Sequence, residues 1–161
     1  MDTRADLIEK QPISDLLPYL KGRRSIRKFK SQPVPQEFID KILEAGTWAP
    51  SAGNVQPWHI YLVYHAEVKQ KLAQAALDQR FIEKAPLVIL VCADRNRAQS
   101  IYGERGETFY MYQDTASLVQ NMLLEAFSLG LGSCWVGAFR DEEVSEITEN
   151  FGNLNLAFNG Q

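Results

Sequence analysis

The segment Lys21–Lys30 has the highest density of residues able to bind an anionic ligand. It holds six Lys or Arg residues and no acid, in a chain whose formal net charge is −3. Alternate side chains of an extended segment project to one side, so Arg23, Ser25 and Arg27 would share a face. Two guanidinium groups and a hydroxyl on one face suit a phosphate group. Taken alone, however, the segment is better explained as a solvated basic turn.

A second group of candidate residues lies in the loop Pro50–Pro57, which is rich in small and turn-forming residues. Ser51, Asn54 and Gln56 have polar side chains that donate and accept hydrogen bonds, so they suit the edge of a planar heterocycle. A turn in which Ser and Asn bond their own backbone explains the loop equally well.

The third candidate segment is Gly130–Phe139, where glycines stand before and within a predicted strand. Such glycines often mark the close approach of a ligand or a second backbone, and a backbone N–H can stabilise developing charge there. A helix stop followed by a buried strand is the simpler explanation when this segment is taken alone.

The rest of the sequence offers no side chain with the setting of a catalytic nucleophile. It has no Ser-His-Asp order, HExxH, Walker loop or GxGxxG. Asp114 and Glu107 are expected to cap a helix, complement its dipole or face solvent rather than act as acid and base. The spacing of Cys92 and Cys134 predicts reduced thiols and no metal site. An enzyme of this kind would take its chemistry from a bound cofactor.

Elements of both secondary-structure types must position these segments. The apolar run Ala85–Ala93 predicts a central strand covered on both faces, and residues 94–106 are expected to be a polar connection. The helix over 107–128 is apolar nearly all round from Ala116 onward, which is typical of a fold centre or a subunit interface. Strands are also expected over 58–64 and 133–139, and further helices over 15–21, 35–45, 67–79 and 141–150. This order indicates an α+β fold.

Length and composition indicate one domain over 1–161, with 45% apolar and 23% charged residues. The acidic balance disfavours nucleic acid or an anionic membrane as partner, and few aromatic residues accompany the basic segment. No apolar stretch is long enough for a membrane span, and the first residues do not resemble a signal peptide. The expected location is the cytoplasm.

Three motifs together resemble the nitroreductase family of FMN-dependent oxidoreductases. They are Arg23–Phe29, Ala49–Trp58 and Gly130–Gly137, and they occur in the family's order within residues 15–149. The resemblance implies a central, mainly antiparallel sheet flanked by helices, with a long buried helix at the interface of a homodimer that holds two FMN molecules.

The same resemblance implies which residues hold the cofactor. Arg23, Ser25 and Arg27 would hold the flavin's phosphate and the pyrimidine end of its ring, with Arg24 adding to the cradle. The loop would approach the flavin from the partner subunit, and the third motif would pass along the ring. The implied residues beyond the basic segment are Pro50, Ser51, Ala52, Asn54, Gln56, Trp135, Val136 and Gly137, with Arg80 as a looser match.

The resemblance implies hydride transfer from NADH or NADPH to a small-molecule acceptor such as a nitroaromatic or a quinone, in a ping-pong cycle. FMN would carry the chemistry, with no catalytic side chain. Aromatic residues between 94 and 112 would line the acceptor pocket: Tyr102, Phe109, Tyr110 and Tyr112. The alternatives are a non-catalytic flavin- or nucleotide-binding module of the same fold and, less favoured, a nucleic-acid-associated dimer.

The C-terminal segment from about residue 150 departs from the family pattern. It carries no charge, so the basic residue that members use near their end has no counterpart after Arg140. One missing charge-assisted contact costs roughly 1.5–3 kcal/mol, which predicts weaker or partial FMN occupancy. Leu154, Leu156 and Phe158 alternate, which predicts a strand that either stays in its own subunit or crosses to the partner.

Overall fold

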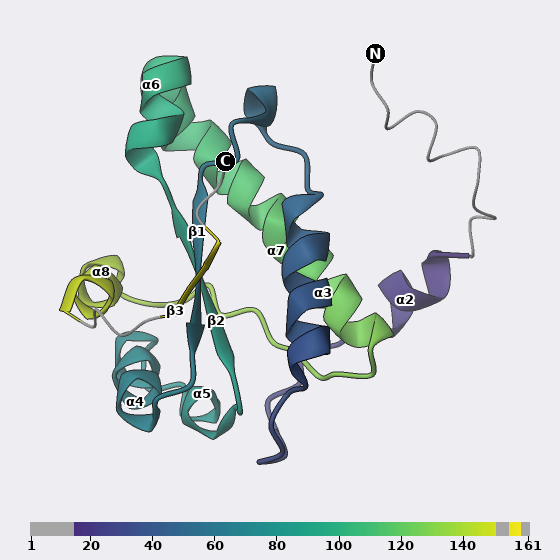
Figure 1. Ribbon diagram of the computed structural model, residues 1–161. Helices are drawn as coiled ribbons and strands as arrows, with labels where there is room; N and C mark the ends of the chain where they lie inside the picture. Colours follow the sequence, from purple (N-terminus) through teal and green to yellow (C-terminus); the bar gives the residue numbers. More distant parts are fainter. Residues whose placement is uncertain (1–14, 151–154, 159–161) are drawn as a thin grey trace.

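A three-stranded antiparallel sheet lies at the centre of the computed structural model, which describes residues 15–150 and 155–158. The strand order is β2-β1-β3, and two helical layers cover the sheet (Figure 1). The strands are β1 (Trp58–Val63), β2 (Val88–Ala93) and β3 (Asn155–Phe158). The helices are α2 (Leu17–Gly22), α3 (Gln36–Thr47), η1 (Ala52–Asn54), α4 (Ala66–Ala75), α5 (Phe81–Lys84), α6 (Arg95–Arg105), η2 (Gly106–Tyr110), α7 (Met111–Ser128) and α8 (Asp141–Asn150).

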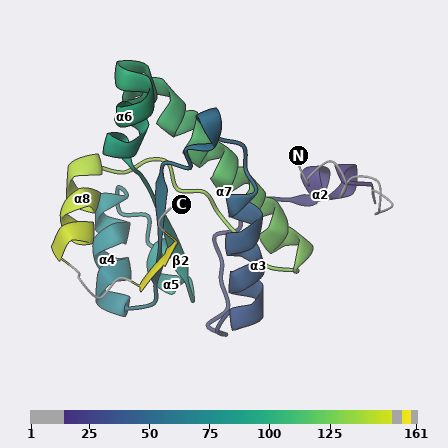
Figure 2. The ribbon, with the colours of Figure 1, turned by 45° about the horizontal axis from the view of Figure 1, so that its top comes forward.

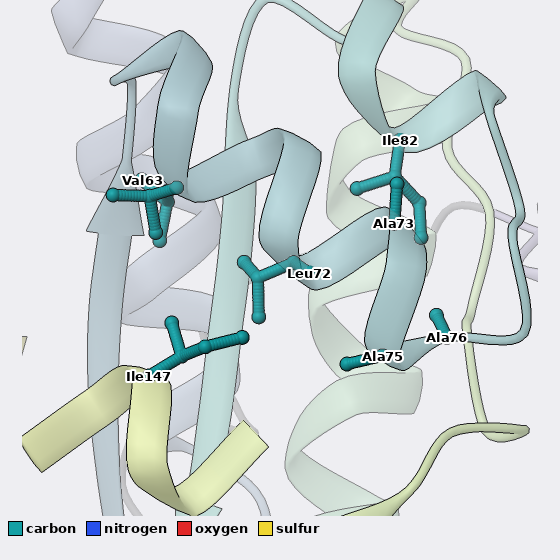
Figure 3. Packing of buried hydrophobic residues seen from close by; sticks show 8 residues of the cluster. Val63, Leu72, Ala73, Ala75, Ala76, Ile82 and Ile147 are labelled. Atoms are coloured by element: carbon teal, nitrogen blue, oxygen red, sulfur yellow. The ribbon is translucent and has the colours of Figure 1, made fainter. Parts of the chain in front are cut away.

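The pleat of β1 explains why there are two apolar clusters. Successive side chains of a strand point to opposite faces, and the register with β2 runs from Trp58 opposite Ala93 to Val63 opposite Val88. Trp58 and Ile60 pack on one face against α3 and α7 and form the first cluster with Leu118. Val63 packs on the other face against α4, α5 and α8, as Figure 3 shows with Leu72, Ile82 and Ile147. Figure 2 shows the two helical layers on either side of the sheet.

Helix α7 lies against the sheet along the first cluster, and its central residue Leu118 is fully buried. The prediction of a helix over 107–128 is therefore largely confirmed, with one difference at its start. Residues Gly106–Tyr110 form a π-helical turn, so the α-helix begins at Met111. Gly130, with a φ of +77°, follows the last turn.

Two predicted elements between 85 and 106 are wrong in part. The apolar run contains β2, whose side chains reach both clusters, but β2 is an edge strand of the sheet and β1 is the central one. An apolar run shows that both faces are covered and contains no information about pairing partners. Residues 94–106, expected to be a connection, form α6, which Asp94 caps by accepting a hydrogen bond from the Arg97 amide at 2.9 Å.

The predicted strand over 133–139 is also wrong. Its only ladder contact in the described chain is an isolated parallel bridge between Ser25 and Ser133. The backbone there instead meets side chains, since Gln79 donates to the Ala138 carbonyl at 3.1 Å. The predicted strand near the C-terminus exists as β3, which pairs antiparallel with β1 of the same chain. Leu154 and the tail after Phe158 lie outside the described residues.

Candidate functional site

The basic segment and the glycine motif, more than a hundred residues apart in the sequence, lie side by side. The Ile26 amide donates to the Ser133 carbonyl at 2.8 Å, beside the Ser25–Ser133 bridge. Gly132 permits this approach, because a Cβ at that position would lie 3.0 Å from the side chain of Ile26. Two of the three predicted motifs therefore form one continuous surface.

The three arginines of the basic segment have different surroundings. Arg23 is half-buried at the C-terminal end of α2. Arg24 folds back, and its Nη1 donates to the carbonyl oxygens of Lys21 and Arg23, so its guanidinium closes the helix. Arg27 is exposed, with its guanidinium carbon 5.7 Å from the centre of the Phe81 ring.

A shallow depression of about 280 Å³ lies between the end of α2 and the chain that follows α7. Residues from both motifs line it: Arg23, Arg24, Ile26, Gly130, Gly132 and Ser133. Among the described residues, no acidic side chain pairs with Arg23 or Arg27. These two guanidinium groups therefore remain available to an external anion.

Arg80 lies in the same region, one residue before the Phe81 ring that contacts Arg27. Its guanidinium makes ion pairs with Glu83 at 3.1 Å and with Asp78 at 3.6 Å. Two neighbouring acids thus already neutralise Arg80. In this arrangement Arg80 is less available to an anion than Arg27.

The third motif continues past Ser133 toward α4 and α8. Val136 packs against the cluster that contains Val63, whereas Trp135 is 47% exposed. The indole of Trp135 lies beside Gly137, where an added Cβ would make an ordinary contact at 3.7 Å. An exposed indole next to a bare backbone forms a flat surface able to contact an aromatic ring system.

The loop that holds Ser51, Asn54 and Gln56 is folded into a strained polar turn. Gly53, Asn54 and Gln56 have φ values of +54°, +57° and +52°. The Ser51 hydroxyl oxygen accepts from the Gln56 amide at 3.0 Å, and the Ala52 amide donates to Asp114 Oδ1 at 3.1 Å. Pro50 is exposed at the entrance of the turn. The alternative of a turn that bonds its own backbone is thus confirmed for Ser51.

The expectation for Asp114 is wrong in part, because the residue stands in the first turn of α7 but is buried there. It is 6% exposed, so it neither faces solvent nor caps α7. Burial raises the pKa of its carboxyl group, and the hydrogen bond from Ala52 acts in the opposite direction. One sequence signal was present, since an acid stands one helical turn before Leu118 on the buried side of α7.

Three of the four aromatic residues expected to line an acceptor pocket gather on α6 and η2, whereas Tyr112 is exposed on the first turn of α7. The rings of Tyr102 and Tyr110 meet edge to face at 5.3 Å, and the Arg105 guanidinium lies over the rings of Phe109 and Tyr110. The hydroxyl of Tyr102 lies where a Cβ on Gly53 would be, at 2.1 Å from that position. This cluster therefore adjoins the loop rather than the basic segment.

The loop and the basic segment contact α7 near its opposite ends. The loop contacts Asp114 near the start of α7, whereas Gly22 packs on Phe127 near its end. Thirteen residues of helix separate these contacts, which is about 20 Å at 1.5 Å per residue. Figure 1 shows η1 beside α6 at one end of the sheet and α5 at the other. Within one chain, the loop therefore contacts α7 about 20 Å along the helix from the point where the basic segment begins.

Within residues 15–150 and 155–158, no helix is long and apolar enough to cross a membrane. No group of three or more His, Cys, Asp or Glu side chains in those ranges is placed to hold a metal ion.

Comparison with known proteins identifies the fold. The model of the Nitroreductase family matches residues 20–80 and 76–152. A Methanothermobacter thermautotrophicus protein, provisionally named an NADH dehydrogenase/NAD(P)H nitroreductase, is 39% identical over 132 residues, which are 82% of this chain and 65% of that protein.

Solved structures agree with the sequence match. Nitroreductase A from Vibrio parahaemolyticus superimposes with a TM-score of 0.76 at 32% identity, over 85% of this chain and 61% of that one. The NADPH:FMN oxidoreductase from Vibrio harveyi, solved with NAD+, gives 0.75 at 30% identity, over 88% and 64%. The chain thus spans less than two thirds of the length of these relatives. The predicted α+β fold is confirmed, and the chain belongs to the nitroreductase family.

Proposed function

We propose that this protein is an FMN-dependent oxidoreductase that takes hydride from NADH or NADPH and passes it to a small-molecule acceptor, such as a nitroaromatic or a quinone, in a ping-pong mechanism. One observation carries the proposal. The segments Arg23–Arg27 and Ser133–Gly137, joined at the Ser25–Ser133 bridge, form a surface with unpaired guanidinium groups at one end and an exposed indole at the other. A flavin nucleotide has a matching anionic tail and planar ring.

The donor set of Arg23, Ser25 and Arg27 fits the phosphate of FMN together with the pyrimidine end of its ring. Arg23 and Arg27 have no acidic partner among the described residues, and Ser25 lies between them with an exposed side chain. Charge-assisted bonds from guanidinium groups to phosphate are short and strong. When bound, FMN would supply the hydride chemistry.

The residues of the chain would bind and tune the cofactor. Arg27, whose guanidinium lies over the Phe81 ring, would place a positive charge that favours an anionic pyrimidine end of the flavin ring. The backbone N–H groups of Val136 and Gly137 supply donors that need no side chain. Trp135 would cover apolar ring surface and exclude water.

We propose that a second copy of the chain completes each site, in a homodimer. The support is the separation of about 20 Å along α7 between the two groups of predicted residues. In a two-fold dimer each loop can reach the basic segment of its partner, so two equivalent sites form. The aromatic residues on α6 and η2, which adjoin the loop of the same subunit, would then lie beside the partner's flavin and border the acceptor position.

Flavin binding and reduction test the proposal with a matched pair of variants. The wild type should bind FMN, and anaerobic NADH or NADPH should bleach the flavin absorbance. Arg23→Gln should weaken FMN binding by about tenfold or more. Lys28→Gln removes the same charge from a side chain on the opposite face of the extended segment, so this variant should bind FMN like the wild type. Bound flavin that neither nucleotide reduces would instead support a non-catalytic binding module.

Mixing two variants tests whether the site is shared. Asn54→Gly keeps a residue that tolerates the left-handed backbone and removes only the side chain. Mixed and re-equilibrated with Arg23→Gln, it should restore about a quarter of the wild-type binding sites, because half of random dimers have one intact site. No restoration in a confirmed mixed dimer would place both groups of residues in one subunit.

A further inference from the structure

The turn at Ser51–Gln56 needs an external anchor. Three of its residues have left-handed backbone angles, and two of them, Asn54 and Gln56, are not glycine. The contact between the Ser51 hydroxyl and the Gln56 amide is local, so it closes the turn without fixing its place on the protein. Strained turns of this kind persist when surrounding structure holds them.

Asp114 supplies a long-range anchor. Its Oδ1 accepts from the Ala52 amide at 3.1 Å across 62 residues of sequence. Asp114 stands one turn before Leu118, which is fully buried at the centre of the first apolar cluster. The carboxylate is therefore carried by a helix packed into the buried core, and the turn is hydrogen-bonded to the carboxylate.

The burial of Asp114 indicates that its hydrogen bond with the Ala52 amide, and not only its packing, matters to the structure. Asp114 and Lys69 are the two charged residues found buried in the described chain. A buried carboxylate is costly unless hydrogen bonds compensate, and the compensating donor given by the structure is the amide that begins η1. An apolar residue here would fill the same space without directing the turn.

We propose that Asp114 is a positioning residue that fixes the Ala52–Asn54 turn in the conformation that presents Ser51 and Asn54 to FMN. The residue acts through the Ala52 amide and does not touch the cofactor. This inference rests on the proposed function for its ligand, but the control of the turn is a property of the protein without cofactor.

Three variants separate the hydrogen bond from packing. Asp114→Leu keeps approximate volume and removes the acceptor, whereas Asp114→Asn keeps both volume and an acceptor oxygen. Ala52→Pro removes the donor alone. Proline is well tolerated at the first position of a helical turn, and Ser51 already has the extended angles that precede proline. Lys69→Met is the control, since it removes the other buried charge, which donates to the Ala85 carbonyl at the far end of the sheet.

Amide hydrogen exchange of the cofactor-free protein is the first readout, and FMN affinity is the second. Asp114→Leu should accelerate exchange at residues 52–56 by about tenfold or more and weaken FMN binding by a similar factor. Ala52→Pro should do the same at residues 53–56, while Asp114→Asn should stay near the wild type. Lys69→Met should lower global stability and leave the turn's relative protection and FMN affinity unchanged.

Two results would overturn the positioning role. One is unchanged exchange across the turn in Asp114→Leu, or in Ala52→Pro should Asp114→Leu not fold. The other is an Asp114→Asn variant as defective as Asp114→Leu, which would assign the effect to charge instead of the hydrogen bond. A wild type that binds no FMN would refute the proposed function, whereas the exchange measurement would still decide whether Asp114 holds the turn.

Discussion

Substitution of Gly53 by alanine should measure how closely Tyr102 of α6 packs against the loop. The residue has a φ of +54°, which costs about 1 kcal/mol or more for a residue with a Cβ. The added Cβ would also lie 2.1 Å from the Tyr102 hydroxyl oxygen and 3.2 Å from the Cζ atom of that ring. Displacing the ring adds about 1–3 kcal/mol, as overpacking does elsewhere. The expected total loss of stability is about 3 kcal/mol.

A double-mutant cycle separates the two contributions. In a Tyr102→Phe background the hydroxyl is absent, and the nearest ring atom needs to move by only a few tenths of an ångström. Gly53→Ala should then cost about 1–2 kcal/mol, which leaves a coupling energy of about 1 kcal/mol or more. Gly130→Ala is the control for the backbone, because Gly130 has a φ of +77° and no atom within 4 Å of the added Cβ.

Urea unfolding followed by far-UV circular dichroism provides the measurement. The midpoint should fall in the order wild type, Gly130→Ala, Gly53→Ala, with an unchanged slope. Equal costs of Gly53→Ala in the wild-type and Tyr102→Phe backgrounds would refute the reasoning. That result would mean that the Tyr102 hydroxyl does not press on the loop, and that α6 and the loop can move independently.

Two further predictions concern the core. Leu118→Ala should lower the free energy of unfolding by about 2–5 kcal/mol because Leu118 is fully buried. The control Leu77→Ala, at a residue 56% exposed, should change that free energy by less than about 0.5 kcal/mol. Similar urea midpoints for the two variants would contradict the placement of Leu118 in the first cluster. Burial raises the pKa of the Cys92 thiol from 9.0 to about 11, so the unfolded chain ionises first as the pH rises. The stability that this thiol contributes is therefore complete below pH 9.0 and is lost toward pH 11. Between these pH values the free energy of unfolding, measured in urea, should fall less in Cys92→Ala than in the wild type. An equal fall in both proteins would show that another group is responsible.

The placement of local elements followed from the sequence because it depends on interactions between near neighbours. The predicted helix over 141–150 matches α8, and Val68 and Leu72 lie on the buried side of α4 as its periodicity indicates. Helix 107–128 was also foreseen, apart from its π-helical first turn. Spacing and side-chain type are sufficient here, since the hydrogen bonds of a helix join residues four apart.

The failures lie where partners are distant in the sequence. The stretch 133–139 has the composition of a strand, yet its one ladder contact in the described chain is with Ser25, and β2 lies at an edge of the sheet. Asp114 was expected to cap a helix, complement its dipole or face solvent; it lies in the first turn of α7 but is buried, where it accepts a hydrogen bond from the distant Ala52 amide. None of these outcomes is encoded within a window of neighbouring residues.

The amino-acid types and their order already reveal which chemical groups this protein carries: a row of cations without acids, a polar turn and a glycine motif, in an order that resembles one family. Where these groups lie relative to one another depends on how the chain packs. The fold joins the first and third motifs through the Ser25–Ser133 bridge and holds the second at the other end of α7. This is because a helix such as α7 separates the groups at its two ends by about 20 Å, and side-chain types do not encode that distance.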